Sequence, residues 1–279
     1  MSGIKNIFFY ALIFLLIIGL CSSILGILPK FNKENKENNK LLSVPSLSVG
    51  TELKGSNGYI SFLGDSITTY KGWSNNSTYN TTIGNNTSYY NPDKKIAVTD
   101  TWWHQSARAL NMSLCVNNSW DGGRVTDTKE GITSGIERAK NLHNDTTNVK
   151  PDLIIVYMGT NDLANGISLY DFEAAYMSML ENIETSYPNA KVYCCTLLPE
   201  SRTSTDTLEA LRLKFNLSIC NMAYNCGYNI IDFASEITDW DYTTDTITDS
   251  WSSGTLRVHP TIAGMDKLSE CVINTISKG

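Results

Sequence analysis

Four short polar segments, far apart along the chain, carry side chains that could act together on a carbonyl group. They are residues 64–66 (GDS), 117–123 (NNSWDGG), 159–162 (GTND) and 259–260 (HP). A serine hydroxyl becomes a nucleophile when a neighbouring base takes its proton, and histidine titrates close enough to neutrality to be that base. Ser66 and His259 are therefore the candidate nucleophile and the candidate base of an acyl-transfer reaction.

The same segments contain donors for the negative charge that develops on an attacked carbonyl oxygen. An oxyanion of this kind is stabilised by N–H groups that are aimed at it before the reaction starts. The backbone N–H of Ser66 and that of Gly122 are two candidates, with Gly123 as the alternative glycine. The side-chain amide of Asn161 is the third candidate. Together they predict an oxyanion hole.

Other polar residues near these segments are interpreted as structural. Asp65 and Asp162 are expected to hydrogen-bond their own loops rather than take part in chemistry. Of the two remaining histidines, His104 is expected on a helix face and His143 in a solvated stretch.

The elements that position the four segments are strands alternating with helices. Apolar runs predict strands at residues 59–63, 114–116, 153–158, 192–198 and 229–233. Helical periodicity is present at residues 101–110, 169–183, 208–222 and 265–276. This alternation predicts a parallel sheet covered by helices on both faces, with ligands bound beyond the carboxyl ends of the strands. The first three polar segments follow predicted strands, and the fourth opens the last predicted helix. All four are therefore expected at one edge of the sheet.

The connection at residues 67–100 is unusually long and has no periodicity. Loops of this length in a compact domain are usually functional or disordered.

The order and placement of the four segments resemble the SGNH (GDSL) hydrolases over residues 57–279. The resemblance implies a flavodoxin-like three-layer α/β/α sandwich with a five-stranded parallel sheet. It implies Ser66 as nucleophile, Gly122 and Asn161 in the oxyanion hole, and His259 as base. Members of the family are esterases, lipases, thioesterases and deacetylases. We expect no cofactor and no metal, and no His/Cys cluster has the spacing of metal ligands.

The chain departs from the family pattern at Leu256, three residues before His259, where the family has an aspartate. In a catalytic triad the acid orients the imidazole and stabilises its charged form, and leucine can do neither. Another carboxylate could take over, a backbone carbonyl could orient the ring of a Ser–His dyad, or the protein could be non-catalytic. The candidate carboxylates lie in the preceding loop, with the last of them nearest in sequence: Asp239, Asp241, Asp245 and Asp249.

Aromatic residues near the motifs suggest a carbohydrate substrate. Trp120 and Trp73 are candidates to line the mouth of the site and stack on a sugar ring, although packing explains both equally well or better. The favoured function is removal of acyl groups, such as O-acetyl, from an extracellular glycan. The alternatives are a lipase or thioesterase and a non-catalytic glycan-binding protein. A glycosidase is less favoured because no motif places a carboxylate pair.

The N-terminal part is expected to be an appendage to the hydrolase domain. Residues 7–28 contain no charge and are long enough to span a bilayer, so residues 1–28 are predicted to be a transmembrane anchor or a signal segment. Residues 29–56 read as a polar linker. Nine Asn-x-Ser/Thr sequons fit an exported surface, although an Asn-rich chain forms some by chance. The domain is therefore expected outside the cell, tethered or secreted.

The charge of the domain argues against nucleic acid as a partner, and the cysteine content bears on disulfide formation. Residues 51–279 carry 17 basic and 26 acidic groups, a net charge of −9, because five Lys and two Glu lie in residues 1–50. Such an acidic domain is a poor ligand for nucleic acid. Six of the seven cysteines lie outside the apolar run, and buried free thiols are slightly favoured over disulfides.

Overall fold

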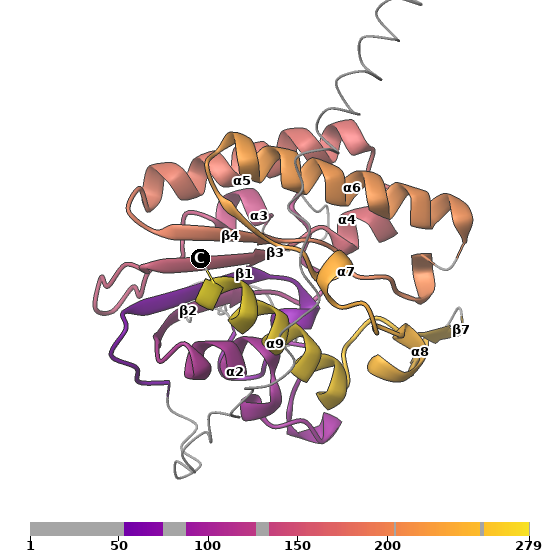
Figure 1. Cartoon of the computed structure of the whole chain (residues 1–279), viewed down its shortest axis with the longest axis horizontal. Coiled ribbons are helices and arrows are strands. Elements are labelled where there is room, and N and C mark those ends of the chain that lie inside the picture. The colour runs from indigo at the N-terminus through magenta and orange to yellow at the C-terminus, as the bar shows by residue number, and fades with distance from the viewer. Residues whose placement is uncertain (1–52, 75–87, 127–133, 204, 252–253, 279) are drawn as a thin grey trace, which may run out of the picture. The chain divides into compact units, whose positions relative to one another are not determined.

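A five-stranded parallel sheet with the order β2-β1-β3-β4-β5 forms the centre of the fold (Figure 1). Its strands are β1 (Tyr59–Gly64), β2 (Ser113–Ser119), β3 (Leu153–Tyr157), β4 (Lys191–Cys195) and β5 (Asn229–Ile231). This is the strand order of flavodoxin-like folds, in which ligands bind where the order reverses. The predicted fold class is confirmed, and the reversal lies at β1, the strand that leads into Ser66.

The computed structural model describes residues 53–74, 88–126, 134–203, 205–251 and 254–278. All of them belong to one compact unit, Val49–Gly279. The predicted anchor at residues 1–28 and most of the predicted linker lie outside the described residues. Within the described part of the chain, no helix is both long and apolar enough to cross a membrane.

Helices cover both faces of the sheet (Figure 1). One face carries α2 (Trp102–Ala109) and α9 (Ile262–Lys278), which pack against each other. The opposite face carries α3 (Gly135–Arg138), α5 (Leu169–Ser186) and α6 (Asp206–Asn225). Of these, α5 packs against both α3 and α6. The shorter elements are α4 (Thr160–Ala164), α7 (Phe233–Glu236), α8 (Tyr242–Asp245) and the hairpin of β6 (Asp249–Trp251) with β7 (Gly254–Leu256).

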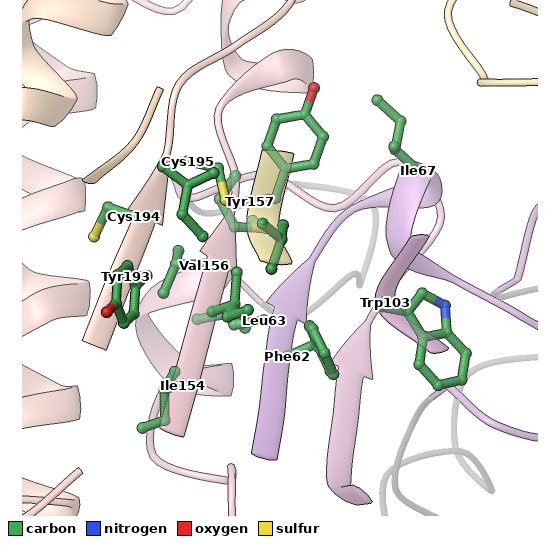
Figure 2. Packing of buried hydrophobic residues seen from close by; sticks show 14 of the residues in the cluster. Phe62, Leu63, Ile67, Trp103, Ile154, Val156, Tyr157, Tyr193, Cys194 and Cys195 are labelled. Carbon is green, nitrogen blue, oxygen red and sulfur yellow. The ribbon is translucent and has the colours of Figure 1, made fainter. Parts of the chain in front are cut away.

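The core is built from strand side chains that are buried on both faces, as Figure 2 shows for β1, β3 and β4. Phe62 packs against Trp102 and Trp103 of α2, with ring centroids 5.5 and 5.9 Å away. On the other face, Phe172 of α5 stacks on Phe215 of α6 at 4.2 Å. Each fully buried side chain of this size contributes about 1.5–3 kcal/mol. This packing fixes the strand ends from which the polar segments emerge.

Strand β2 is longer than predicted because three polar residues belong to it. The prediction ended at residue 116, whereas the strand continues through Asn117 and Asn118 to Ser119. Both asparagines are buried and bond to backbone carbonyls, Asn117 to Thr68 and Asn118 to Arg138. These hydrogen bonds offset part of the cost of burying the two amides, although Oδ1 of Asn117 is buried without a partner. The strand therefore continues through polar residues that a hydrophobic pattern does not mark.

Three predicted strands end early, β3 by one residue and β4 and β5 by more. Strand β4 ends at Cys195 rather than at residue 198, and β5 ends at Ile231 because the Asp232 side chain caps α7. The six cysteines of the described residues are free thiols: Cys115, Cys194, Cys195, Cys220, Cys226 and Cys271. The expected buried free thiols are observed in part, because four of the six are buried and Cys220 and Cys226 are partly exposed.

Candidate active site

Ser66 stands on a tight turn directly after β1. The Asp65 side chain caps this turn by accepting the N–H of Ile67 at 2.9 Å, as expected for a residue that bonds its own loop. A Cβ on Gly64 would lie 2.5 Å from the Thr68 hydroxyl, so the turn requires glycine there. Ser66 is consequently presented at the carboxyl edge of the sheet with little of its surface exposed.

The structure brings His259 to Ser66 across 193 residues of sequence, with Nε2 of the imidazole 2.9 Å from Oγ of the serine. Two backbone contacts hold the histidine segment. The carbonyl of His259 accepts the N–H of Ile247 at 2.7 Å, and the carbonyl of Pro260 accepts the hydroxyl of Tyr90 at 2.9 Å. The base is thus fixed in reach of the nucleophile.

Asp249 supplies the carboxylate that Leu256 does not. Its Oδ2 lies 3.0 Å from Nδ1 of His259. Asp249 and Leu256 are register partners in the antiparallel β6–β7 pair. When Nδ1–H donates to this carboxylate, Nε2 carries the lone pair that accepts the proton of Ser66. Of the three interpretations of the missing aspartate, replacement by another carboxylate fits this geometry.

The ionisation states suit a neutral base beside an anionic acid. Burial lowers the pKa of His259 below its ordinary value, against the opposing hydrogen bond to Asp249. Burial alone would raise the pKa of Asp249, but hydrogen bonds from His259 and Tyr89 outweigh it and bring that pKa to about 2. At neutral pH the imidazole is therefore free to take a proton and the carboxylate is charged.

Gly122 and Asn161 line the same cavity as Ser66 and His259. Gly122 has a φ of 69°, a conformation that favours glycine. Gly123 instead faces the interior, since a Cβ there would lie 2.8 Å from Nη2 of Arg138. Asn161 donates one amide hydrogen to the carbonyl of Gly123 at 3.0 Å. A side-chain amide has two N–H donors, so the second can serve a ligand.

Two buried charged residues connect the loops that form the site. Asp162 accepts the N–H groups of Val125 and Thr126 at 2.9 and 3.0 Å, so it bonds the loop after Gly122 and not its own loop as expected. Arg138 donates to the carbonyls of Gly64 and Asn118 at 2.8 and 2.7 Å, joining the ends of β1 and β2. The sequence did not indicate Arg138, because nothing in its local pattern marks a buried arginine.

The cavity in front of Ser66 is small, about 260 Å³. The cavity is lined by Ser66, His259, Gly122 and Asn161. Asp121, Arg202, Val258 and the β7 strand Gly254–Leu256 complete the lining. The Arg202 guanidinium is held by Glu200, with Nε 2.6 Å from a carboxylate oxygen. A larger cavity of about 560 Å³ lies along α9, but none of the predicted site residues line it. We therefore assign the chemistry to the smaller cavity.

Both tryptophans follow the packing alternative rather than the sugar-stacking one. Trp120 is 1 % exposed, and its indole N–H donates to Asn118 at 2.9 Å, so it is a core residue of the β2 end. Trp73 packs against Trp103 and His104 and does not line the cavity. The expectation that they form a sugar-stacking surface is wrong for Trp120 and unsupported for Trp73.

Comparison with known proteins identifies a family and several solved structures that this chain resembles. The model of the GDSL-like lipase/acylhydrolase family matches residues 62–267. A search of curated proteins finds no significant match.

Among solved structures, a protein from Bacteroides ovatus described as a GDSL-like lipase is 25 % identical with a TM-score of 0.57, over 80 % of this chain and 100 % of that one. A second such protein from Bacteroides uniformis is 22 % identical, with a TM-score of 0.53 and coverage of 80 % and 96 %. A catalytic mutant of an acetylxylan esterase from Geobacillus stearothermophilus is 17 % identical, with a TM-score of 0.54 over 80 % of this chain and 96 % of that one.

Proposed function

The chain belongs to the GDSL-like lipase/acylhydrolase family, and from that premise we propose that it is a serine ester hydrolase acting on short acyl groups, above all O-acetyl groups of carbohydrate. The observation that carries this proposal is the hydrogen-bonded series Asp249–His259–Ser66, with distances of 3.0 and 2.9 Å. Each donor and acceptor in the series has the partner that nucleophilic catalysis requires.

In the proposed reaction, His259 takes the proton of Ser66 as its oxygen attacks the ester carbonyl. The negative charge on the carbonyl oxygen is stabilised by the N–H groups of Ser66 and Gly122 and by the amide of Asn161. Asp249 stabilises the imidazolium, which then protonates the departing alcohol. Water, deprotonated by the same imidazole, next attacks the acyl-enzyme and releases the carboxylic acid and free Ser66.

The size and lining of the cavity support a short acyl group. A volume of about 260 Å³ is below the range usual for drug-sized ligands. Leu256 and Val258 are the large apolar side chains that line it, which is little surface for a long lipid chain. The fold also serves in the acetylxylan esterase named above, although that likeness concerns the fold alone. A long-chain lipase is therefore the less favoured alternative.

The position of Asp249 counts against the non-catalytic alternative. That interpretation depended on His259 having no acid partner, and the Asp249 carboxylate at 3.0 Å supports the catalytic interpretation instead.

The direct test of the proposed function is release of acetate. The purified full-length protein should hydrolyse p-nitrophenyl acetate faster than p-nitrophenyl palmitate, and it should release acetate but no sugar from an acetylated xylan. Ser66→Ala is the matched inactive control. Sugar release would indicate a glycosidase, and absence of activity on all three substrates would reject the proposal.

We also keep the sequence-based proposal that the domain acts outside the cell, held by residues 1–28. Its support is the uncharged apolar run at residues 7–28. The sequons add less than expected, since Asn117 and Asn216 are buried and hydrogen-bonded in the domain. Extraction of the protein from membranes by detergent but not by alkaline carbonate would support a tether, and release by carbonate would oppose it.

A further inference from the structure

Tyr89, in the long connection before α2, contacts both His259, the partner of Ser66, and Asp249, the partner of His259. Its hydroxyl lies 2.7 Å from Oδ1 and 2.6 Å from Oδ2 of Asp249. Its ring stacks on the imidazole of His259, with centroids 3.4 Å apart and planes inclined by 14°. One side chain therefore touches the acid through its hydroxyl and the base through its ring.

Asp249 needs such an anchor because of where it stands. It begins β6, a three-residue strand that pairs with β7 outside the main sheet. A two-stranded hairpin is marginally stable by itself. Lys94 adds a second contact, with its Nζ 3.2 Å from Oδ1 of Asp249 and 4.2 Å from the centre of the Tyr89 ring. Lys94 is one-third exposed, so solvent weakens this ion pair.

Tyr89 is itself tied to the nucleophile segment. Its backbone N–H donates to the hydroxyl of Thr69 at 2.9 Å, and that hydroxyl donates to the carbonyl of Ser66 at 2.8 Å. The ring of Tyr90 packs edge-on against Tyr89 at 4.8 Å. Burial raises the pKa of Tyr89, so its hydroxyl stays protonated and donates to Asp249.

We propose that Tyr89 is a positioning residue, which holds the carboxylate of Asp249 and the ring of His259 in line with Ser66. It fixes the geometry in which Asp249 contacts His259, in place of the aspartate that the resemblance leads one to expect at Leu256. The inference rests on the proposed esterase function for its kinetic consequences, but the contacts themselves do not depend on that function.

The role has an electrostatic signature. The charged and titratable groups around the imidazole are Asp249, Asp121, Arg202 and the two tyrosines, with Lys94 acting on Asp249. The Tyr89 hydroxyl takes part of the hydrogen-bonding capacity of the Asp249 carboxylate. Without that hydroxyl, the carboxylate stabilises the imidazolium more strongly, and the pKa of His259 rises.

The test compares Tyr89→Phe, Tyr89→Leu and the control Tyr70→Phe. Tyr70 lies in the same connection, and its buried hydroxyl donates to Ile96 at 3.0 Å without contacting Asp249 or His259. The pH profile of kcat/KM on p-nitrophenyl acetate is measured for each full-length variant. NMR titration of the His259 ring is feasible because the chain has three histidines.

Tyr89→Phe should lower kcat by about ten-fold with little change in KM, and it should move the acid limb of kcat/KM to higher pH. Tyr89→Leu, which also removes the stacked ring, should lower kcat further. Tyr70→Phe should leave the acid limb of kcat/KM at the wild-type pH. If Tyr89→Phe keeps the wild-type limb and the wild-type His259 titration, the inference is overturned. If the wild type hydrolyses no ester, the proposed function fails, and the NMR titration alone decides the role of Tyr89.

Discussion

Asp249 lies directly opposite Leu256 in the β6–β7 pair, and its carboxylate reaches His259 at 3.0 Å. Side chains of antiparallel register partners point to the same face, about 5 Å apart. The carboxylate that contacts His259 therefore comes from the neighbouring strand of the hairpin, directly across from Leu256. A spacing rule along the chain misses this arrangement because strand pairing, rather than sequence distance, brings the two groups together.

Asp249→Asn should lower kcat by about 10²–10⁴ on p-nitrophenyl acetate, because an amide in this place stabilises the imidazolium less and can favour the wrong tautomer. Asp239→Asn is the matched control, since Asp239 is in the same loop and its side chain is 76 % exposed. Equal activity of the two variants would show that Asp249 does not act as the acid.

Asn161→Ala should lower kcat by about 10²–10³ with KM nearly unchanged, if its amide stabilises the oxyanion. Asn161→Asp should cost at least as much, because it puts a negative charge where the oxyanion forms. Steady-state kinetics of both variants are the measurement. A rise in KM at constant kcat would assign Asn161 to ground-state binding instead.

Asp121→Asn should move the acid limb of kcat/KM to lower pH. Asp121 lines the cavity, and its charge raises the pKa of His259. The limb reports loss of the free base as pH falls through that pKa, so removing the charge lets His259 stay neutral to lower pH. This shift is opposite in direction to that expected for Tyr89→Phe. Shifts of the same sign in both variants would contradict the electrostatic account.

The sequence was sufficient for the fold and for the motif residues, because both depend on local patterns. Buried strands such as β3 (Leu153–Tyr157) are continuous apolar runs, and Ser66 and Asn161 lie in motifs directly after strands. The end of β2 was missed because Asn117 and Asn118 are polar residues, and the hydrogen bonds that allow their burial form only in the folded domain.

The supporting residues could not be predicted because their contacts span the whole domain. Tyr89 meets Asp249 across 160 residues, and Arg138 meets Gly64 across 74. Trp120 shows the converse error, since closeness in sequence to Gly122 says nothing about the direction of its ring, which points into the core. The one usable signal was the length of the connection at residues 67–100, which does supply Tyr89 and Lys94.

Asp65→Asn should stabilise the protein increasingly as pH rises from about 4 to 7. Burial, partly offset by the N–H of Ile67, raises the pKa of Asp65 from 3.8 to about 7. In that pH window the folded chain binds a proton that the unfolded chain has released, so stability falls as pH rises. The asparagine removes this dependence and can still accept from Ile67.

The free energy of unfolding of Asp65→Asn should exceed that of the wild type by roughly 2–4 kcal/mol above pH 7. Urea unfolding of both proteins at several pH values measures it. A difference between the two proteins that does not change with pH would show that Asp65 has an ordinary pKa.

The central claim is that His259 and Asp249 activate Ser66 as a nucleophile. Its most direct measurement is reaction of the full-length protein with a fluorophosphonate, followed by mass spectrometry of the labelled peptide and by the labelling rate. We predict a single label on Ser66 in the wild type, none in Ser66→Ala, and labelling in His259→Ala that is slower by about 10² or more. Failure of the wild type to react, or an unchanged rate in His259→Ala, would contradict the account.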